Sequence, residues 1–156
     1  MTDHQFAARI TWTGNKGEGT AGYRAYARDH EIAIDGKPAI MGSSDPAFRG
    51  DPARHNPEDL LIASLSACHM LWFLHLAAEA GLVVETYTDD ATGAMVMEKS
   101  GAGQFREVIL RPRVEISAGD ARLAPALHEK AHNLCFIARS VNFPVRCEGE
   151  ISLQKG

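Results

Sequence analysis

The sequence predicts an α+β fold in which a mostly antiparallel sheet packs around one long buried helix and a second helix. Three observations support this prediction: alternating runs near both ends of the chain, a long apolar run between them, and a second helical segment before the last alternating run. The expected order is βββαββαβ, in a single domain that spans residues 1–156.

Length and composition restrict the class of protein. The chain has 156 residues, of which 45% are hydrophobic and 23% charged, and this is typical of a globular domain. Its net charge of −4 gives no basic field for nucleic acid. Three cysteines are too few for a secreted disulfide framework, and the first residues lack a basic cluster followed by an apolar run. We therefore expect a cytoplasmic protein with reduced cysteines.

The first part of the chain predicts three strands and a loop. Apolar and polar side chains alternate over residues 5–13 and 23–28, as in strands with one buried face. A glycine-rich turn over 14–19 separates them, and a short third strand covers 31–35. Residues 38–55 show no period and are rich in Gly, Ser and Pro, so we expect a long loop of the kind that often carries function.

Residues 60–80 predict the long helix. The residues before it favour a helix N-terminus, namely Asn56 as the N-cap followed by Pro57, Glu58 and Asp59. The segment is long enough to span a bilayer, but His69 and His75 lie within it, so we do not expect a membrane span. A helix that is apolar on nearly every side is buried on every side, and we expect a partner subunit to help cover it.

The rest of the chain predicts a hairpin, a second helix and a last strand. Two long strands over 83–99 and 105–117 flank a turn at 100–103. The second helix covers 121–140, and apolar residues alternate again over 145–153.

Cys68 lies in the middle of the predicted long helix and has two interpretations. A free cysteine is often no more than a small core residue. A thiol in an apolar site is unreactive unless a cation favours its thiolate. A reactive Cys68 therefore requires an arginine, a lysine or a protonated histidine nearby, and the residues alone leave both interpretations open.

The second helix carries three residues of types that bind zinc. His128, His132 and Cys135 are spaced by four and three residues, which places their side chains on one stripe of a helix. No paired Cys-x-x-Cys accompanies them, so two histidines on a partly exposed face and a core cysteine explain the pattern better than a metal site does. Cys147 is expected to be an ordinary residue of the last strand, and His69 a satisfied core histidine.

Four short segments add a more specific pattern. An Asn-Pro-Glu start of the long helix is followed, ten residues after its Glu58, by Cys68 in Ser-Ala-Cys. Cys135 ends His-Asn-Leu-Cys on the later helix, and an Asn-x-Pro-Val turn follows at 142–145. Together these segments resemble the OsmC/Ohr family of thiol peroxidases, and the resemblance covers nearly the whole chain. It implies an intertwined homodimer with active sites at the subunit interface and with no metal or organic cofactor.

The resemblance also implies an activity. Family members reduce organic hydroperoxides, and often hydrogen peroxide, with two cysteines. Carried over to this chain, Cys68 attacks the peroxide and becomes a sulfenic acid, and Cys135 resolves it into a disulfide. A dithiol reductant, of the lipoyl type or similar, then restores both thiols. Neither nucleic acid nor a membrane is an expected partner.

The family further implies an arginine held by the glutamate of the Asn-Pro-Glu motif, here Glu58. One branch of the family places this arginine just after the first strand, where residues 14–17 contain none. The other branch places it in the loop before the motif, which favours Arg49 over Arg54 and Arg24.

Two positions depart from the family pattern. Phe136 stands where many relatives have a proline after the second cysteine, and His69 stands where an aromatic or aliphatic residue is common. A second class of protein also fits the sequence: a non-enzymatic protein on the same fold that binds a small apolar ligand, or a metal through His128, His132 and Cys135.

Overall fold

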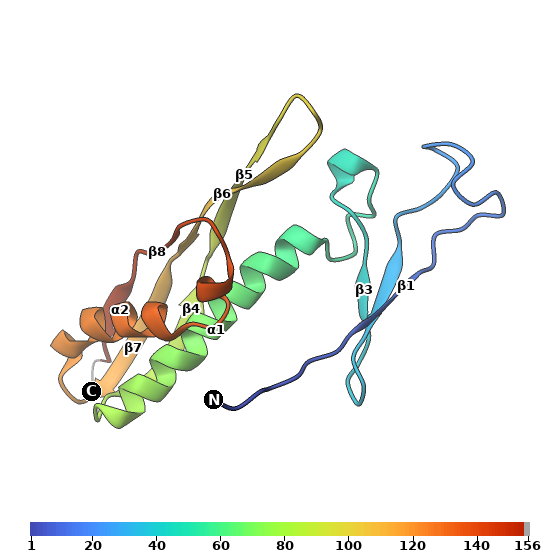
Figure 1. The fold of residues 1–156 in the computed structure, drawn as a ribbon. Helices are drawn as coiled ribbons and strands as arrows, with labels where there is room; N and C mark the ends of the chain where they lie inside the picture. Colours follow the sequence, from blue (N-terminus) through green and yellow to red (C-terminus); the bar gives the residue numbers. More distant parts are fainter. Residues whose placement is uncertain (155–156) are drawn as a thin grey trace. The chain divides into compact units, whose positions relative to one another are not determined.

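A computed structural model describes residues 1–154 of the protein. The chain divides into two compact units, residues 1–60 and 61–156, and each is described by itself. Three strands and a long helix are followed by four strands, a second helix and two strands (Figure 1). The predicted α+β class and both helices are confirmed, whereas the predicted order βββαββαβ is wrong because several predicted strands are each divided in two.

The first unit contains a three-stranded antiparallel sheet in the order β1-β2-β3. Its strands are β1 (Arg9–Trp12), β2 (His30–Ala33) and β3 (Ile40–Gly42). β1 lies within the strand predicted over 5–13, and β2 overlaps the strand predicted over 31–35, but β3 lies in the segment predicted to be a loop. The remainder of that segment is irregular and includes a 3-10 helix over Pro46–Phe48.

The strand predicted over 23–28 is wrong. Arg28 folds this segment back on itself, because its guanidinium donates hydrogen bonds to the carbonyl oxygens of Tyr23 and Tyr26 at 2.7 Å each. The same guanidinium lies over both tyrosine rings, 4.5 and 3.9 Å from their centroids. The alternation of aromatic and basic residues therefore forms a stacked cluster and not a strand with one buried face.

The long helix, α1 (Pro57–Glu79), begins where the sequence predicts. The side-chain oxygen of Asn56 accepts a hydrogen bond from the backbone N–H of Asp59 at 2.8 Å, as an N-cap does. α1 is long and apolar enough to cross a bilayer by length and composition, a test that the core helix of a soluble protein also passes.

Burial of α1 is limited to one face within this chain. The buried residues are spaced by three or four positions and form one stripe: Leu65, His69, Phe73, Leu76 and Ala77. The opposite side is exposed at Ala63, Ala67 and Leu71, and the Leu71 side chain is 63% exposed. The expected burial on every side is therefore not reached by one copy of the chain.

The second unit contains two three-stranded sheets, β4-β7-β9 and β5-β6-β8. Four of the strands are β4 (Val83–Asp89), β5 (Thr92–Met97), β6 (Gly103–Leu110) and β7 (Pro112–Ala118). β5 and β6 form the predicted hairpin. Each of the two long strands predicted here is interrupted, because the Asp89 carboxylate accepts a hydrogen bond from the backbone N–H of Arg111 at 2.6 Å. This side-chain contact replaces a ladder bond at the corner where the chain changes sheets.

The last part of the chain completes both sheets. α2 (Ala124–Leu134) is shorter than the helix predicted over 121–140, because 3-10 helices at Ala121–Leu123 and Ala138–Ser140 occupy its ends. β8 (Val145–Cys147) pairs in parallel with β6, and β9 (Glu150–Leu153) pairs in parallel with β7. The predicted last strand is thus two strands in two sheets.

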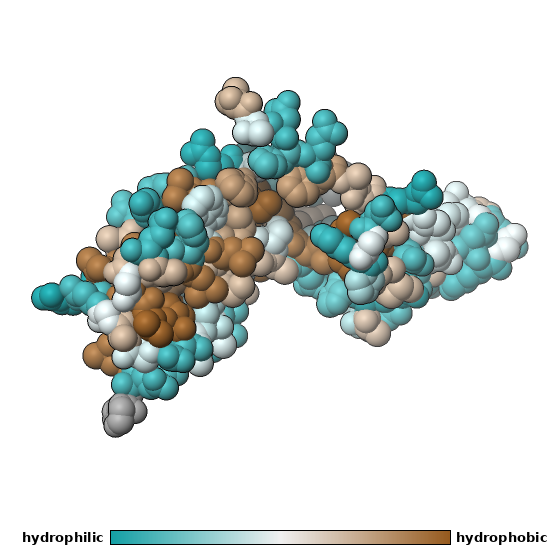
Figure 2. Space-filling view, turned by 90° about the horizontal axis from the view of Figure 1, so that it is seen from below, coloured by the Kyte–Doolittle hydropathy of each residue, from teal (hydrophilic) through white to brown (hydrophobic). Residues whose placement is uncertain are grey.

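The second unit has two groups of buried apolar residues. The larger group joins α1, α2 and the β4-β7 pair around Phe73, and the smaller one joins Leu65 to β6 and β8. Apolar residues also gather on the surface in the left half of Figure 2. Both helices therefore contribute to the core, and α1 also leaves the apolar side chain of Leu71 exposed.

Candidate functional site

Cys68 and Cys135 are neighbours in the second unit. Burial raises the pKa of the Cys135 thiol above its ordinary value, and the adjacent Cys68 thiol raises it further, while a hydrogen bond from the Ala138 N–H opposes this shift. Cys68 is half-buried on α1, whereas Cys135 is only 1% exposed. All three cysteines of the chain are free thiols. The structure therefore brings together the two cysteines that the sequence analysis selected.

The backbone after α2 fixes the position of the Cys135 thiol. The helix ends at Leu134, and Cys135 takes an extended conformation with φ −63° and ψ 115°. Its Sγ accepts a hydrogen bond from the backbone N–H of Ala138 at 3.4 Å. Its carbonyl oxygen accepts another from the N–H of Arg139 at 3.0 Å. The thiol is thus held on a tight turn beyond the end of the helix.

Phe136 connects this turn to α1. Its ring meets the ring of Trp72 edge to face, with 5.6 Å between centroids and an interplanar angle of 80°. Trp72 lies one helical turn after Cys68, so the contact is adjacent to the cysteine pair. The residue that replaces the family proline therefore forms an aromatic contact beside the two thiols.

The other predicted site residues belong to the first unit. Arg49 ends the 3-10 helix with a positive φ of 64° and is exposed, and its guanidinium carbon lies 6.0 Å from the centroid of the Tyr23 ring. Glu58 is half-buried in the first turn of α1. Across residues 1–154, Arg49 and Glu58 form no ion pair with each other.

The two alternative arginines differ in their surroundings. The Nε atom of Arg54 lies 3.5 Å from Asp29 and 3.7 Å from Asp51, so two carboxylates already surround its charge. Arg24 is exposed.

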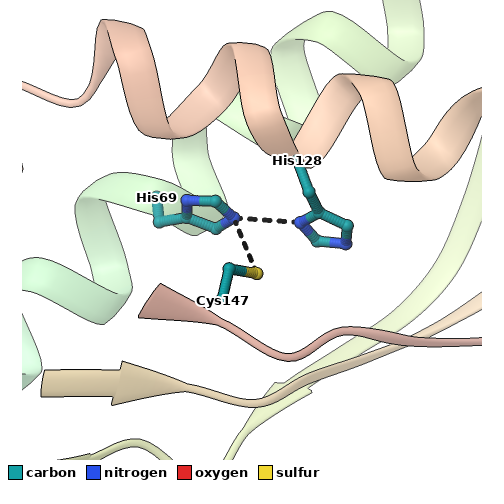
Figure 3. A group of neighbouring side chains, drawn as sticks. All are labelled: His69, His128 and Cys147. Carbon is teal, nitrogen blue, oxygen red and sulfur yellow. Dashed lines mark hydrogen bonds between the residues drawn. The ribbon is translucent and has the colours of Figure 1, made fainter. Parts of the chain in front are cut away.

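A second cluster was not predicted from the sequence. His69 from α1, His128 from α2 and Cys147 from β8 point toward one another (Figure 3). Nε2 of His69 lies 2.9 Å from Nδ1 of His128, and Sγ of Cys147 lies 3.8 Å from Nε2 of His69. The three ligand atoms all lie within 4.8 Å of one another.

Burial controls the charge of this cluster. It lowers the pKa of His69 to about 4; a charge on His132 lowers it further, and Asp89 opposes the shift. Burial also lowers the pKa of His128 to about 4, with a smaller contribution from His69. Both imidazoles are therefore neutral at pH 7. Burial raises the pKa of the Cys147 thiol to about 11, with smaller contributions from Asp89 and Glu148, so this thiol is protonated.

The predicted trio of His128, His132 and Cys135 is not formed. Among residues 1–154, the ligand-type side chains that come together are instead His69, His128 and Cys147. The prediction fails because α2 ends before Cys135, whose extended backbone removes it from the helical stripe of the two histidines. His69 and Cys147 carried no signal in the sequence, because their approach depends on how β8 pairs with β6 beneath the two helices.

Comparison with known proteins identifies the family. Residues 50–150, which include both cysteines of the neighbouring pair, match the family model described as OsmC-like protein. The chain belongs to the OsmC-like family. The family predicted from the sequence is thus confirmed.

Relatives of this OsmC-like protein match it along nearly all of its length. A solved structure of an OsmC-like protein of unknown function from Vibrio cholerae is 34% identical, with a TM-score of 0.84, and covers 94% of this chain and 99% of its own. The uncharacterized protein YmaD of Bacillus subtilis is 26% identical over 162 residues, which is 100% of this chain and 99% of YmaD.

An organic hydroperoxide resistance protein from Elizabethkingia anophelis has the same fold. It is 18% identical, with a TM-score of 0.67, and the match covers 98% of this chain and 99% of that protein.

Proposed function

We propose that this OsmC-like protein is a thiol-dependent peroxidase that reduces organic hydroperoxides through Cys68 and Cys135. The observation that carries the proposal is the proximity of the two thiols, one from α1 and one from the turn after α2, through which Cys68 raises the pKa of Cys135. Family membership supports it, since relatives of the same fold from Elizabethkingia anophelis and Legionella pneumophila are described as organic hydroperoxide resistance proteins.

The proposed reaction has three steps. The Cys68 thiolate attacks one peroxide oxygen, so that an S–O bond forms, the O–O bond breaks, and the leaving alkoxide takes up a proton to become an alcohol. Cys135 then attacks the sulfenic sulfur, and a disulfide forms with release of water. A dithiol reductant of the lipoyl type or similar exchanges with this disulfide and restores both thiols.

The difference in burial supports this division of roles. Cys68 is half-buried and open to a substrate, while Cys135 is enclosed and pinned by the Ala138 N–H. The raised pKa of Cys135 keeps it a thiol, so it does not compete for peroxide before Cys68 is oxidised. Cys68 is therefore the first nucleophile and Cys135 the resolving residue.

Arg49 is the proposed cation that favours the Cys68 thiolate, with Glu58 as the carboxylate that orients it. Among residues 1–154, no carboxylate, Glu58 included, lies within 4.0 Å of the Arg49 guanidinium, so the proposed pairing requires the loop that carries Arg49 to move. Arg54 is a weaker candidate because Asp29 and Asp51 already neutralise it.

The proposal includes a homodimer. The exposed face of α1, with Ala63, Ala67 and Leu71, is apolar, and burial of such a face against a second copy is favourable. The second copy also supplies the cover that the sequence predicts for α1. Sedimentation of the reduced protein as a monomer at micromolar concentration would contradict this part of the proposal.

The test is a single oxidation of the reduced protein with one equivalent of cumene hydroperoxide, followed by intact mass and a count of free thiols. We expect the three thiols to fall to one, with a mass loss of two hydrogens. Cys68→Ser should abolish the reaction, and Cys147→Ser is the matched control that should still lose two thiols. Three unreacted thiols in the wild-type protein would refute the proposed function.

A further inference from the structure

We propose that His69, His128 and Cys147 form a binding site for a divalent metal ion of the zinc type, separate from the Cys68–Cys135 pair. The three side chains come from α1, α2 and β8 and offer two imidazole nitrogens and one sulfur toward a common point (Figure 3). Imidazole and thiolate are the ligands that zinc prefers in proteins.

Two of the three separations between ligand atoms are near those of a zinc site, and the third, between His128 and Cys147, lies within 4.8 Å and closes when the ion is bound. With Zn–N and Zn–S bonds of usual length, tetrahedral geometry separates two nitrogens by about 3.4 Å, and a nitrogen from a sulfur by about 3.6 Å. The observed separations are 2.9 Å from His69 Nε2 to His128 Nδ1, and 3.8 Å from that His69 atom to Cys147 Sγ. The two nitrogens thus need to part by roughly 0.5 Å. A small rotation of the His69 ring would provide this, since the His128 ring is stacked on Phe73.

Burial shields the cluster from solvent. His69 is 1% exposed and His128 6% exposed, so bulk water has little access to either ring. The ring of His128 is stacked on Phe73, with 4.0 Å between centroids, which holds its plane in place. A metal with three protein ligands in such a setting keeps one position for a further ligand.

The charge and proton balance of binding is simple. Both imidazoles are neutral before the metal binds. One of the two facing nitrogens, His69 Nε2 or His128 Nδ1, carries the proton of their hydrogen bond, and this proton moves to the other nitrogen of the same ring so that both facing nitrogens can bind the metal. The Cys147 thiol loses its proton to solvent, and the sulfur becomes a thiolate on the ion. A dication with one thiolate leaves a net charge of +1, and Asp89, whose charge acts on both His69 and Cys147, partly balances it.

The test uses full-length protein that has been reduced and freed of metal with a chelator. Zinc is titrated in competition with a chromophoric chelator, and cobalt is added separately for absorption spectroscopy. We expect one equivalent of zinc for each chain. The cobalt form should show a thiolate-to-cobalt charge-transfer band and the intense visible bands of a tetrahedral site.

Variants assign the ligands. Cys147→Ser should remove the charge-transfer band and weaken zinc binding by more than about 100-fold, which exceeds the usual effect of an outer-shell substitution. His132→Gln and Cys135→Ser are the matched controls, since they change a histidine and a cysteine outside the cluster and should keep both the band and the affinity.

Two results would overturn the proposal. One is a wild-type protein that binds less than one equivalent of zinc or gives no charge-transfer band. The other is loss of the band in Cys135→Ser and its retention in Cys147→Ser, which would place the metal on the cysteine pair. If Cys147→Ser does not fold, alkylation of Cys147 in the wild-type protein is measured by peptide mass with and without zinc. Zinc should protect Cys147 from alkylation, and equal alkylation in both samples would contradict the proposal.

Discussion

The cysteine pair and the histidine–cysteine cluster include consecutive residues of α1 but differ in access. Cys68 and His69 are consecutive in α1, and a rotation of about 100° per residue turns them toward different neighbours. Cys68 is half-buried beside Cys135, whereas His69 is 1% exposed beside His128. The first arrangement leaves a sulfur atom partly accessible, and the second encloses two neutral imidazoles. The comparison teaches that adjacent residues of one helix can face different surroundings, which both proposals require.

The largest effect expected is on peroxide turnover. Cys135→Ser should reduce steady-state turnover by more than about 1,000-fold while leaving the first reaction with peroxide intact, because only resolution is lost. A dimedone adduct on Cys68, detected by mass spectrometry, checks this. Cys147→Ser is the control and should turn over normally; equal loss in both variants would remove the distinction between the two sites.

Zinc should increase the free energy of unfolding by binding to His69, His128 and Cys147. At a free zinc concentration of 100 times the dissociation constant, mass action stabilises the folded state by about 2.7 kcal/mol. The gain should appear in denaturant unfolding of the wild-type protein and disappear with excess chelator. Cys147→Ser should show no gain, while a gain that persists in this variant would contradict the assigned ligands.

Acid should destabilise the metal-free protein through the histidine pair. Burial lowers the pKa of His69 and of His128 from 6.5 to about 4, so between these values the unfolded chain binds more protons than the folded chain. Stability is therefore complete above pH 6.5 and decreases as the pH falls toward 4, by on the order of 2 kcal/mol between pH 7 and 5 for each histidine.

Urea unfolding at several pH values, with chelator present, measures this slope. The titratable groups that face the two histidines are His132, Asp89 and Cys147, and none of these residues is substituted in the experiment. His75→Gln is the control, because His75 is an exposed histidine on the same helix and should not alter the slope. A wild-type stability that is flat from pH 7 to 5 would show that the pair is not neutral in the folded state.

A smaller effect is expected from Gly149→Ala. A Cβ atom at this position would lie 3.2 Å from Nε2 of His128, closer than most side-chain contacts in proteins. The ring cannot move away easily because Phe73 stacks on it, so we expect a loss of roughly 1 kcal/mol in unfolding free energy. Zinc affinity should weaken in the same variant, while peroxide oxidation of Cys68 should not change.

The sequence predicted the features that depend on local chemistry. The α1 start follows from the Asn56 cap, and the β5–β6 hairpin follows from the glycine-rich turn between its strands. The two cysteines were selected through a resemblance that rests on their spacing from other motifs. Such local signals predict structure correctly because the residues that carry them form their contacts with residues close in sequence.

Most features that the sequence did not predict depend on distant contacts, as the corner at Asp89 depends on the backbone N–H of Arg111. The folded segment before β2 is an exception: Arg28 contacts tyrosines only two and five residues away, where alternation of side chains favours a strand. The histidine–cysteine cluster requires the register that pairs Cys147 with Leu110 across parallel strands. Nothing in the spacing of His69 and Cys147 along the chain indicates this approach.

The most direct measurement is a non-reducing peptide map of the protein after one equivalent of organic hydroperoxide. The account predicts a disulfide-linked peptide pair that contains Cys68 and Cys135, with Cys147 recovered as a free thiol. A link between Cys68 and Cys147, or recovery of all three cysteines unlinked, would contradict it.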